Sequence, residues 1–423
     1  MNGEIVGMIY FDNAATSFPK PETMYRAMDE FARRSLGNPG RAGHRLSRDS
    51  EFAIDRCRVL LNRFFHGEGP RRFIFTLNGT DALNLAIKGA VSPGDHVVTG
   101  NLEHNSVLRP IHTLEKAGVI HVTRLRSNAA GYYRPEDVAE AIRPSTRLVV
   151  LTDASNVLGT IQSTAAIGQI CREKGVLFLV DAAQSAGARA IDVQRECIDL
   201  LATSGHKSLL GPTGTGVLYV GPRAQLRSWR EGGTGGDSLL PTQPTELPFL
   251  LEAGTPNVLG IVGLSAGMEY LLDKGMEQVA AIHDRWVRLL HDALATVPNA
   301  TIYSCPLHDR GSEPSQVLKM VSTVESTGRD SFSSADHDST ATPSRIPVVT
   351  FNLGGIAPED LATVLDHDFQ IAVRAGLHCA PTAHEHLGTV PDGAVRVSLG
   401  IFNSESEILA LAEALRSIAR ELS

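Results

Sequence analysis

Lys207 is the residue of this chain whose position most clearly indicates chemistry. It comes just after an apolar run at 200–203 and just before a glycine-rich stretch at 211–216. In open α/β sheets, ligands bind beyond the carboxyl ends of the strands. A lysine enclosed there by apolar chain can have a lowered pKa and form a Schiff base. The other six lysines are expected on helix faces or at the surface, where a charge stays solvated: Lys20, Lys88, Lys116, Lys174, Lys274 and Lys319.

Two further segments place complementary groups at expected strand ends. Asp181 follows the apolar run 176–180, where a carboxylate is costly unless it is paired. A carboxylate is also the partner that keeps the pyridine nitrogen of pyridoxal phosphate (PLP) protonated. The Asn-Gly-Thr segment at 78–80 precedes a helical pattern, so its backbone N–H groups and hydroxyl could bind a phosphate. Asp181 could instead be a helix N-cap, and many turns of α/β proteins look like 78–80. Each segment alone is therefore a weak signal. The combination of both with Lys207, Ser204 and His206, all at expected strand ends, is a stronger one.

Short β-rich runs alternate with helical patterns between about residues 70 and 220. Near-continuous apolar runs fit strands that are buried on both faces. Their alternation with helices predicts a mostly parallel α/β sheet covered by helices. The connection between the last two runs has several glycines and little helical pattern, so we expect those strands to form an antiparallel hairpin. Strands are expected at 72–76, 96–99, 119–123, 148–152, 176–180, 200–203 and 216–220, and helices at 81–90, 106–117 and 163–174.

The rest of the chain predicts a second, smaller α/β domain. Residues 221–257 are rich in Gly, Pro and Thr and read as a long irregular stretch, which is usually functional or disordered. The segment 306–345 has too few large apolar residues to offset its ordering entropy, so we expect a flexible insertion rather than a regulatory segment. The predicted domains are 20–265 (large) and 1–19 with 266–423 (small). A long helical region is expected at 258–297, strands at 301–304, 348–352 and 395–398, and helices at 358–365 and 405–422.

The composition is that of an ordinary globular protein with a mild excess of acidic residues. Of 423 residues, 42% are hydrophobic and 20% charged, and 39 Lys and Arg against 47 Asp and Glu give a formal charge of −8. This balance argues against nucleic-acid binding, which needs a basic face. No apolar run approaches the ~18 residues of a membrane helix. The first residues also lack the pattern of a signal peptide. We therefore expect a cytoplasmic protein with neither nucleic acid nor membrane as a partner.

The five cysteines indicate free thiols in a reducing compartment. They are odd in number, widely scattered and without CxxC spacing. Cys379 differs from the rest because it lies in an expected loop beside His378 and Pro381. A small buried core residue is the alternative for it, since free cysteines are often buried. The others lie in helical or strand patterns and are expected to be structural: Cys57, Cys171, Cys197 and Cys305.

Nine short blocks, in family order over nearly the whole chain, resemble those of the class V aminotransferases, specifically the cysteine desulfurase family. The resemblance implies a PLP-dependent transferase of the aspartate aminotransferase-like fold (fold type I). Such a fold has a mostly parallel seven-stranded sheet in a large domain plus a smaller α/β domain. The blocks are 10–16 (YFDNAAT), 40–47 (GRAGHRLS), 78–86 (NGTDALNLA), 103–106 (EHNS), 154–160 (ASNVLGT), 181–184 (DAAQ), 204–207 (SGHK), 252–257 (EAGTPN) and 373–381 (VRAGLHCAP).

The resemblance also implies a role for each cofactor-binding residue. Lys207 would carry PLP as a Schiff base, and Asp181 would pair with the ring nitrogen. His104 would stack on the pyridine ring, and Gln184 would donate a hydrogen bond to the ring oxygen. The phosphate would be bound by Gly79, Thr80, Ser204, His206 and, in an expected homodimer, the partner subunit's Thr255.

For the substrate, the resemblance implies a carboxylate site. Asn156 and Arg396 would hold the carboxylate, because a guanidinium can clamp it bidentately, and Arg374 would assist. Asn13 and His44, from two of the matching blocks, complete the predicted substrate-binding set.

Cys379 separates a desulfurase from an ordinary aminotransferase. The thiolate is the nucleophile, and a thiol with an ordinary pKa of ~8.5 is only partly ionised at neutral pH, so a cation such as Arg374 would help. In the implied reaction, L-cysteine displaces Lys207 from PLP, which serves as an electron sink. Cys379 then attacks the substrate sulfur and becomes a persulfide, alanine leaves, and Lys207 carries protons. A sulfur-acceptor protein is a further expected partner.

Other interpretations stay open at this point. A class V aminotransferase or a C–S lyase, for example a selenocysteine lyase, would use the same cofactor without needing Cys379. A metal-binding or scaffold protein on the same fold would be non-catalytic. His378, Cys379, His384 and His386 crowd one segment, but their spacing matches no standard zinc pattern, so no metal site is predicted.

Two departures from the family pattern bear on the site. Asp153 stands where many relatives of the resembled family have histidine, which puts the local fine-tuning of the site in question. The stretch between Cys379 and Arg396 is somewhat longer than in the best-known desulfurases. The Cys379 loop could therefore differ in its reach or in the sulfur acceptor that it serves.

Overall fold

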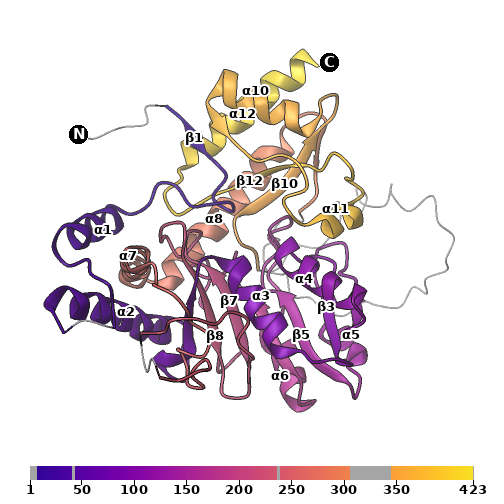
Figure 1. Ribbon diagram of the computed structural model, residues 1–423. Coiled ribbons are helices and arrows are strands. Elements are labelled where there is room, and N and C mark those ends of the chain that lie inside the picture. The colour runs from indigo at the N-terminus through magenta and orange to yellow at the C-terminus, as the bar shows by residue number, and fades with distance from the viewer. Residues whose placement is uncertain (1–6, 41–42, 236–238, 305–343, 423) are drawn as a thin grey trace.

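A seven-stranded sheet forms the centre of the larger part of the molecule (Figure 1). The structure is a computed structural model that describes residues 7–40, 43–235, 239–304 and 344–422. The strand order is β2-β8-β7-β6-β5-β3-β4, and β8 alone runs antiparallel to its neighbours β2 and β7. The strands are β2 (Phe73–Thr76), β3 (His96–Gly100), β4 (His121–Leu125), β5 (Thr146–Thr152), β6 (Leu177–Asp181), β7 (Leu200–Ser204) and β8 (Gly216–Val220).

The sequence predictions of a mostly parallel sheet and of an antiparallel final pair are confirmed. The near-continuous apolar runs form strands buried on both faces because successive side chains point to opposite sides. Val149 and Phe178 belong to one core, whereas Val150 and Leu179 belong to a second core on the other face. Strand β4 begins two residues later than expected, at His121.

Helices cover both faces of this sheet (Figure 1). Helices α3 and α4 contribute to the core on one face. Helices α2, α6 and α7 contribute to the core on the other. The helices of this part are α1 (Glu22–Arg34), α2 (Arg45–Phe64), α3 (Gly79–Ala90), α4 (Asn105–Lys116), α5 (Pro135–Ala141), α6 (Thr164–Glu173) and α7 (Val258–Lys274), with a 3-10 turn at Pro70–Arg72.

The C-terminal elements build a second, smaller sheet with its own core. Strands β9 (Ala300–Ile302), β10 (Val348–Leu353) and β12 (Val395–Ser398) form an antiparallel sheet in the order β12-β10-β9. Strand β1 (Ile9–Tyr10) pairs in parallel with β11 (Ile371–Ala372), so the N-terminal strand lies with the C-terminal elements. The helices here are α8 (Met276–Ala295), α10 (Pro358–Phe369), α11 (Pro381–Leu387) and α12 (Glu405–Glu421).

Two expectations need correction. The helical region expected at 258–297 is two helices, because Gly275 adopts a left-handed φ of 84° between α7 and α8. The Cys379 loop leads directly into the short helix α11, which the sequence analysis did not predict. The predicted insertion 306–345 lies almost wholly outside the described residues, and so does Cys305.

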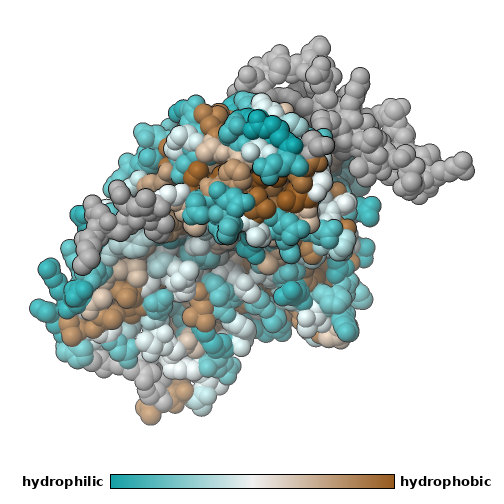
Figure 2. Space-filling model, turned by 90° about the horizontal axis from the view of Figure 1, so that it is seen from above, coloured by the Kyte–Doolittle hydropathy of each residue, from teal (hydrophilic) through white to brown (hydrophobic). Residues whose placement is uncertain are grey.

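The surface seen from above is a mosaic of hydrophilic and hydrophobic residues (Figure 2). In the described part of the chain, no helix is both long and apolar enough to cross a membrane.

Candidate active site

A cavity of about 230 Å³ opens where the carboxyl ends of β5, β6 and β7 face the segment that carries Cys379. This is where ligands bind in open α/β sheets. Most of the predicted site residues meet here. Those that line the cavity are Gly79, Thr80, His104, Asn156, Asp181, Gln184, Ser204, His206, Lys207, Arg374, Cys379 and Arg396.

Lys207 lies three residues beyond the end of β7 and is half-buried. Burial lowers the pKa of its amine to about 8, although the nearby Asp181 carboxylate opposes this shift. A substantial fraction of the amine is therefore neutral near pH 8, as a nucleophilic lysine requires. The backbone of this segment is held by Ser17, whose hydroxyl donates to the Lys207 carbonyl over 2.7 Å.

Lys20 does not behave as the sequence analysis expected. Its Nζ donates to Ser17 Oγ and to the His206 carbonyl, each over 2.6 Å, and burial lowers its pKa to about 7. Lys20 therefore braces the chain next to Lys207 instead of extending into solvent. Its partner carbonyl lies 186 residues away, so local sequence gave no indication of this contact.

Asp181 is the last residue of β6 and is 4% exposed. Its Oδ1 accepts the Ala183 N–H over 3.0 Å. Burial raises the pKa of this carboxyl, while the Ala183 N–H and the Lys207 charge act in the opposite direction. A cationic ring nitrogen in the cavity would add to these stabilising groups and favour the ionised carboxylate.

The N-terminus of α3 and the end of β7 form one side of the cavity. Asn78 caps α3 by accepting the Asp81 N–H over 2.9 Å. At Gly79 a Cβ atom would lie 2.5 Å from Ser204 Oγ, so glycine leaves room for the Ser204 hydroxyl against the start of α3. Within the described chain the Ser204 hydroxyl has no hydrogen-bond partner, and the buried His206 Nδ1 has none either. These unpartnered groups beside a helix N-terminus suit an anion.

His104 caps α4 with its ring. Nδ1 accepts the Ser106 N–H over 3.0 Å, so a neutral ring must carry its proton on Nε2. Burial lowers the pKa of His104 to about 4, helped by the Lys207 and Arg374 charges. Ser106 Oγ also lies 2.7 Å from Thr80 Oγ1, which ties α4 to the beginning of α3.

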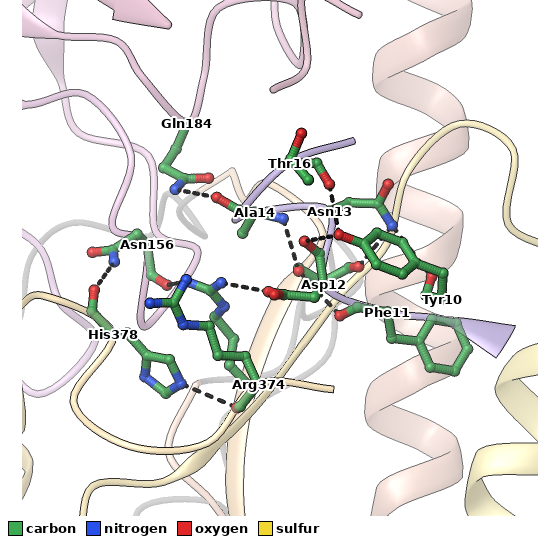
Figure 3. A network of polar contacts seen from close by, with 12 residues as sticks. Tyr10, Phe11, Asp12, Asn13, Ala14, Thr16, Asn156, Gln184, Arg374 and His378 are labelled. Atoms are coloured by element: carbon green, nitrogen blue, oxygen red, sulfur yellow. Dashed lines mark hydrogen bonds and ion pairs between the residues drawn. The ribbon is translucent and has the colours of Figure 1, made fainter. Parts of the chain in front are cut away.

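Arg396 and Asn156 also line the cavity, and Figure 3 shows Asn156 in a network of polar contacts with Asp12 and His378 nearby. Arg396 is 2% exposed; it donates to Asp12 Oδ1 over 2.8 Å and to the Asn156 carbonyl over 3.2 Å. Its Nε is buried without a partner within the described chain. The guanidinium is thus fixed in place with a donor still free for a carboxylate. Asp12 was not among the predicted residues, although it lies in the quoted block 10–16.

Cys379 lies on an exposed turn at the cavity. His378 and Cys379 both have left-handed φ angles, of 49° and 57°. The Cys379 carbonyl accepts the Asn105 N–H over 2.7 Å, which links the turn to the start of α4. By contrast Cys57, Cys171 and Cys197 are buried, as predicted for structural cysteines.

The structure does not bring three predicted residues to this cavity. Asn13 is buried elsewhere, where its amide donates to the Ser398 carbonyl and Asn403 Oδ1. His44 is exposed and caps α2 by accepting the Ser47 N–H over 3.2 Å. Thr255 lines a different cavity of about 440 Å³ beside α2. These three residues were predicted because they lie in matching sequence blocks, and a matching block does not specify where a side chain points.

The two departures from the family pattern now have a structural account. Asp153 does not line the cavity but forms a buried ion pair with Arg189, with 2.7 Å between Oδ1 and Nη2. Arg189 also pairs with Glu196, so Asp153 serves a structural network. Between Cys379 and Arg396 the chain forms α11, and His378 and His384 face each other with ring nitrogens 3.0 Å apart.

Comparisons with known proteins agree with this geometry. The family profile "Aminotransferase class-V" matches residues 9–323 and 315–411. A probable cysteine desulfurase of Halalkalibacterium halodurans is 33% identical, over 96% of this chain and 92% of that protein. A cysteine desulfurase of Haloferax volcanii is 31% identical, over 98% and 90%. The apo structure of the cysteine desulfurase from Thermococcus onnurineus NA1 superposes with a TM-score of 0.84, at 30% identity over 98% of this chain and 95% of that one.

Proposed function

Because the chain belongs to the class V aminotransferase family, among relatives that are cysteine desulfurases, we propose that it converts L-cysteine to L-alanine and transfers the sulfur to Cys379. The observation that carries this proposal is one juxtaposition. An exposed cysteine on a constrained turn lines the same cavity as a half-buried lysine with a lowered pKa.

The cavity fits pyridoxal phosphate. Among the residues that the structure describes, Ser204 Oγ and His206 Nδ1 have no hydrogen-bond partner, and as polar atoms beside the N-terminus of α3 they suit the phosphate. Asp181, whose burial otherwise disfavours its charge, suits the ring nitrogen. Lys207 would hold the aldehyde carbon, and Gln184 and His104 would contact the ring. When bound, PLP would supply an electron sink that weakens the C–S bond of the substrate.

The protein side chains would then divide the remaining tasks. Arg396, oriented by Asp12, and Asn156 would bind the substrate carboxylate and fix its Cα near Lys207. The Lys207 amine, with a pKa of about 8, would take up and return a proton at Cα. His104 would present only its Nε2–H to the cavity side, because Nδ1 is occupied by Ser106.

The sulfur step uses Cys379 as the nucleophile. Its thiolate attacks the sulfur of cysteine, the S–S bond forms, and the C–S bond breaks with its electron pair left on carbon. Protonation of that carbon gives alanine, so cysteine and one protein thiol yield alanine and one protein persulfide. The Arg374 and Arg396 cations line the same cavity as Cys379.

We also propose a homodimer in which the partner subunit's Thr255 completes the phosphate site. Thr255 lines a second cavity and not the one around its own chain's Lys207, which supports this proposal. Sedimentation of the holoenzyme tests it, and a monomer with full activity would contradict it.

The proposed function is tested by the products of purified enzyme with PLP, L-cysteine and dithiothreitol. We expect a yellow protein that forms equal amounts of alanine and sulfide. Cys379→Ala should lose both products while keeping the visible absorbance of the cofactor. Cys197→Ala is the matched control, because Cys197 also has a left-handed φ, of 56°, but is buried away from the cavity.

Two results would contradict the proposal. A Cys379→Ala enzyme that still forms alanine and sulfide at the normal rate would indicate a C–S lyase that does not use a protein thiol. A yellow wild-type enzyme that forms no alanine from cysteine would indicate another amino-acid substrate.

A further inference from the structure

A chain of hydrogen-bonded side chains lies behind Cys379, and the proposed reaction gives it no role. Thr389 Oγ1 lies 2.8 Å from His384 Nδ1, and His384 Nε2 lies 3.0 Å from His378 Nδ1. At the other end, His378 Nε2 lies 3.2 Å from the Arg374 carbonyl oxygen. All three side chains are buried, and His384 is fully inaccessible. The last ring of this chain belongs to the residue that immediately precedes Cys379.

The geometry fixes where each proton lies. A carbonyl oxygen can only accept, so His378 Nε2 must carry a hydrogen and donate it to Arg374. In a neutral ring His378 Nδ1 then accepts from His384 Nε2–H, and His384 Nδ1 accepts from the Thr389 hydroxyl. All three hydrogen bonds therefore run in one direction.

Both rings are neutral in this arrangement. Burial lowers the pKa of His378 to about 2 and that of His384 to about 4, and the Arg396 charge adds to both shifts. The charged groups that face His378 are the cations Arg374 and Arg396. These hydrogen-bonded side chains are thus a fixed support, and neither histidine takes up a proton near pH 7.

The turn that carries Cys379 needs such support. Two consecutive non-glycine residues, His378 and Cys379, have left-handed φ angles, which persist only where surrounding contacts impose them. Two contacts act on the backbone: Asn105 N–H on the Cys379 carbonyl and the Asn156 amide on the His378 carbonyl, both over 2.7 Å. The His378 ring supplies a third contact through its Nε2–H to the Arg374 carbonyl, and His384 fixes the ring from its other nitrogen.

We propose that His384 is a positioning residue for sulfur transfer, which acts through the His378 ring to hold Cys379 toward the substrate. His384 does not line the cavity, so it touches neither substrate nor cofactor. The link to sulfur transfer rests on the proposed function, whereas the hydrogen-bond chain does not. A glutamine at 384 can still donate from its amide nitrogen and accept at its amide oxygen, whereas leucine can do neither.

The hydrogen-bond chain is tested on the apoprotein with ¹⁵N-labelled histidine. Long-range ¹H–¹⁵N spectra at pH 7 should show both His378 and His384 neutral and protonated on Nε2, with signals assigned from His378→Gln and His384→Gln. Protonation of His378 on Nδ1, or a positively charged ring, would overturn the proposal.

The role in sulfur transfer is tested by comparing His384→Leu with His384→Gln. A nucleophile misplaced by ~1 Å can cost about 100-fold in rate. We expect kcat for alanine and sulfide to fall about 10- to 100-fold in the leucine variant, with KM for cysteine within about threefold of wild type. The absorbance change that cysteine causes at the cofactor should remain. Glutamine should restore kcat to within about threefold of wild type, because it keeps the hydrogen bonds.

A milder pair covers the case in which the leucine variant fails to fold. Thr389→Val removes only the hydroxyl that donates to His384 and should lower kcat about 3- to 10-fold, whereas Thr389→Ser should not. A glutamine variant as slow as the leucine variant, or an unchanged kcat in His384→Leu and Thr389→Val, would overturn the proposal. If wild type forms no alanine or sulfide, the link to sulfur transfer fails with the proposed function, and the spectra still decide the hydrogen-bond chain.

Discussion

The close contact between Gly79 and Ser204 leads to a quantitative prediction about cofactor binding. A Cβ added at Gly79 would lie 2.5 Å from Ser204 Oγ, but its next nearest atoms would be at an ordinary 3.6 Å. Gly79→Ala should therefore force the Ser204 hydroxyl to rotate away, without disturbing the backbone. A hydrogen bond to a charged group contributes ~1.5–3 kcal/mol. Losing the one from Ser204 to phosphate should weaken PLP binding about 10- to 150-fold.

The double variant separates this mechanism from a general disturbance of α3. Ser204→Ala alone should weaken PLP binding by a similar factor, since it removes the same hydroxyl. In Gly79→Ala/Ser204→Ala the clash is gone as well, so its Kd should equal that of Ser204→Ala. The assay is titration of each apoenzyme with PLP, followed by visible absorbance. The reasoning is refuted if the two effects multiply in the double variant, or if Ser204→Ala binds PLP normally.

Two further predictions concern the charged groups of the cavity. Lys207 reacts only as the neutral amine, and its pKa is about 8. The rate at which the apoenzyme takes up PLP should therefore rise about tenfold per pH unit below pH 8 and level off above it. A flat rate between pH 6 and 8 would contradict this. Asp12 accepts a hydrogen bond from Arg396 over 2.8 Å and so orients the guanidinium. Removing one partner of a buried ion pair costs ~3–5 kcal/mol. The cost is smaller for this pair because the Asp12 side chain is 21% exposed. Asp12→Ala should therefore raise KM for cysteine at least about tenfold, with Asp12→Asn closer to wild type, and an unchanged KM in steady-state assays would disprove the role of this pair.

The fold and the centre of the site could be read from the sequence because their signals are local. Each buried strand is a short apolar run; Asp181 ends one of them, and Lys207 lies three residues beyond another. Position in the sheet then brings them together. The break between α7 and α8 was missed because a single glycine, Gly275, lies within an otherwise continuous helical pattern.

The groups that hold the reactive residues could not be predicted in the same way. Asp12 contacts Arg396 across 384 residues, and Lys20 contacts the His206 carbonyl across 186 residues. Such pairs depend on how separate elements pack, which no local pattern encodes. Conversely, His44 lies in a matching block yet faces solvent, because sequence similarity does not specify where a side chain points.

The central claim is that Cys379 receives the sulfur atom, and a single turnover tests it directly. The holoenzyme is mixed with a slight excess of L-cysteine without reductant, trapped by alkylation and digested for peptide mass spectrometry. We predict one additional sulfur atom on the Cys379 peptide, in an amount equal to the alanine formed, and none on the peptides of Cys57, Cys171 or Cys197. Alanine formed while Cys379 carries no additional sulfur would contradict the account.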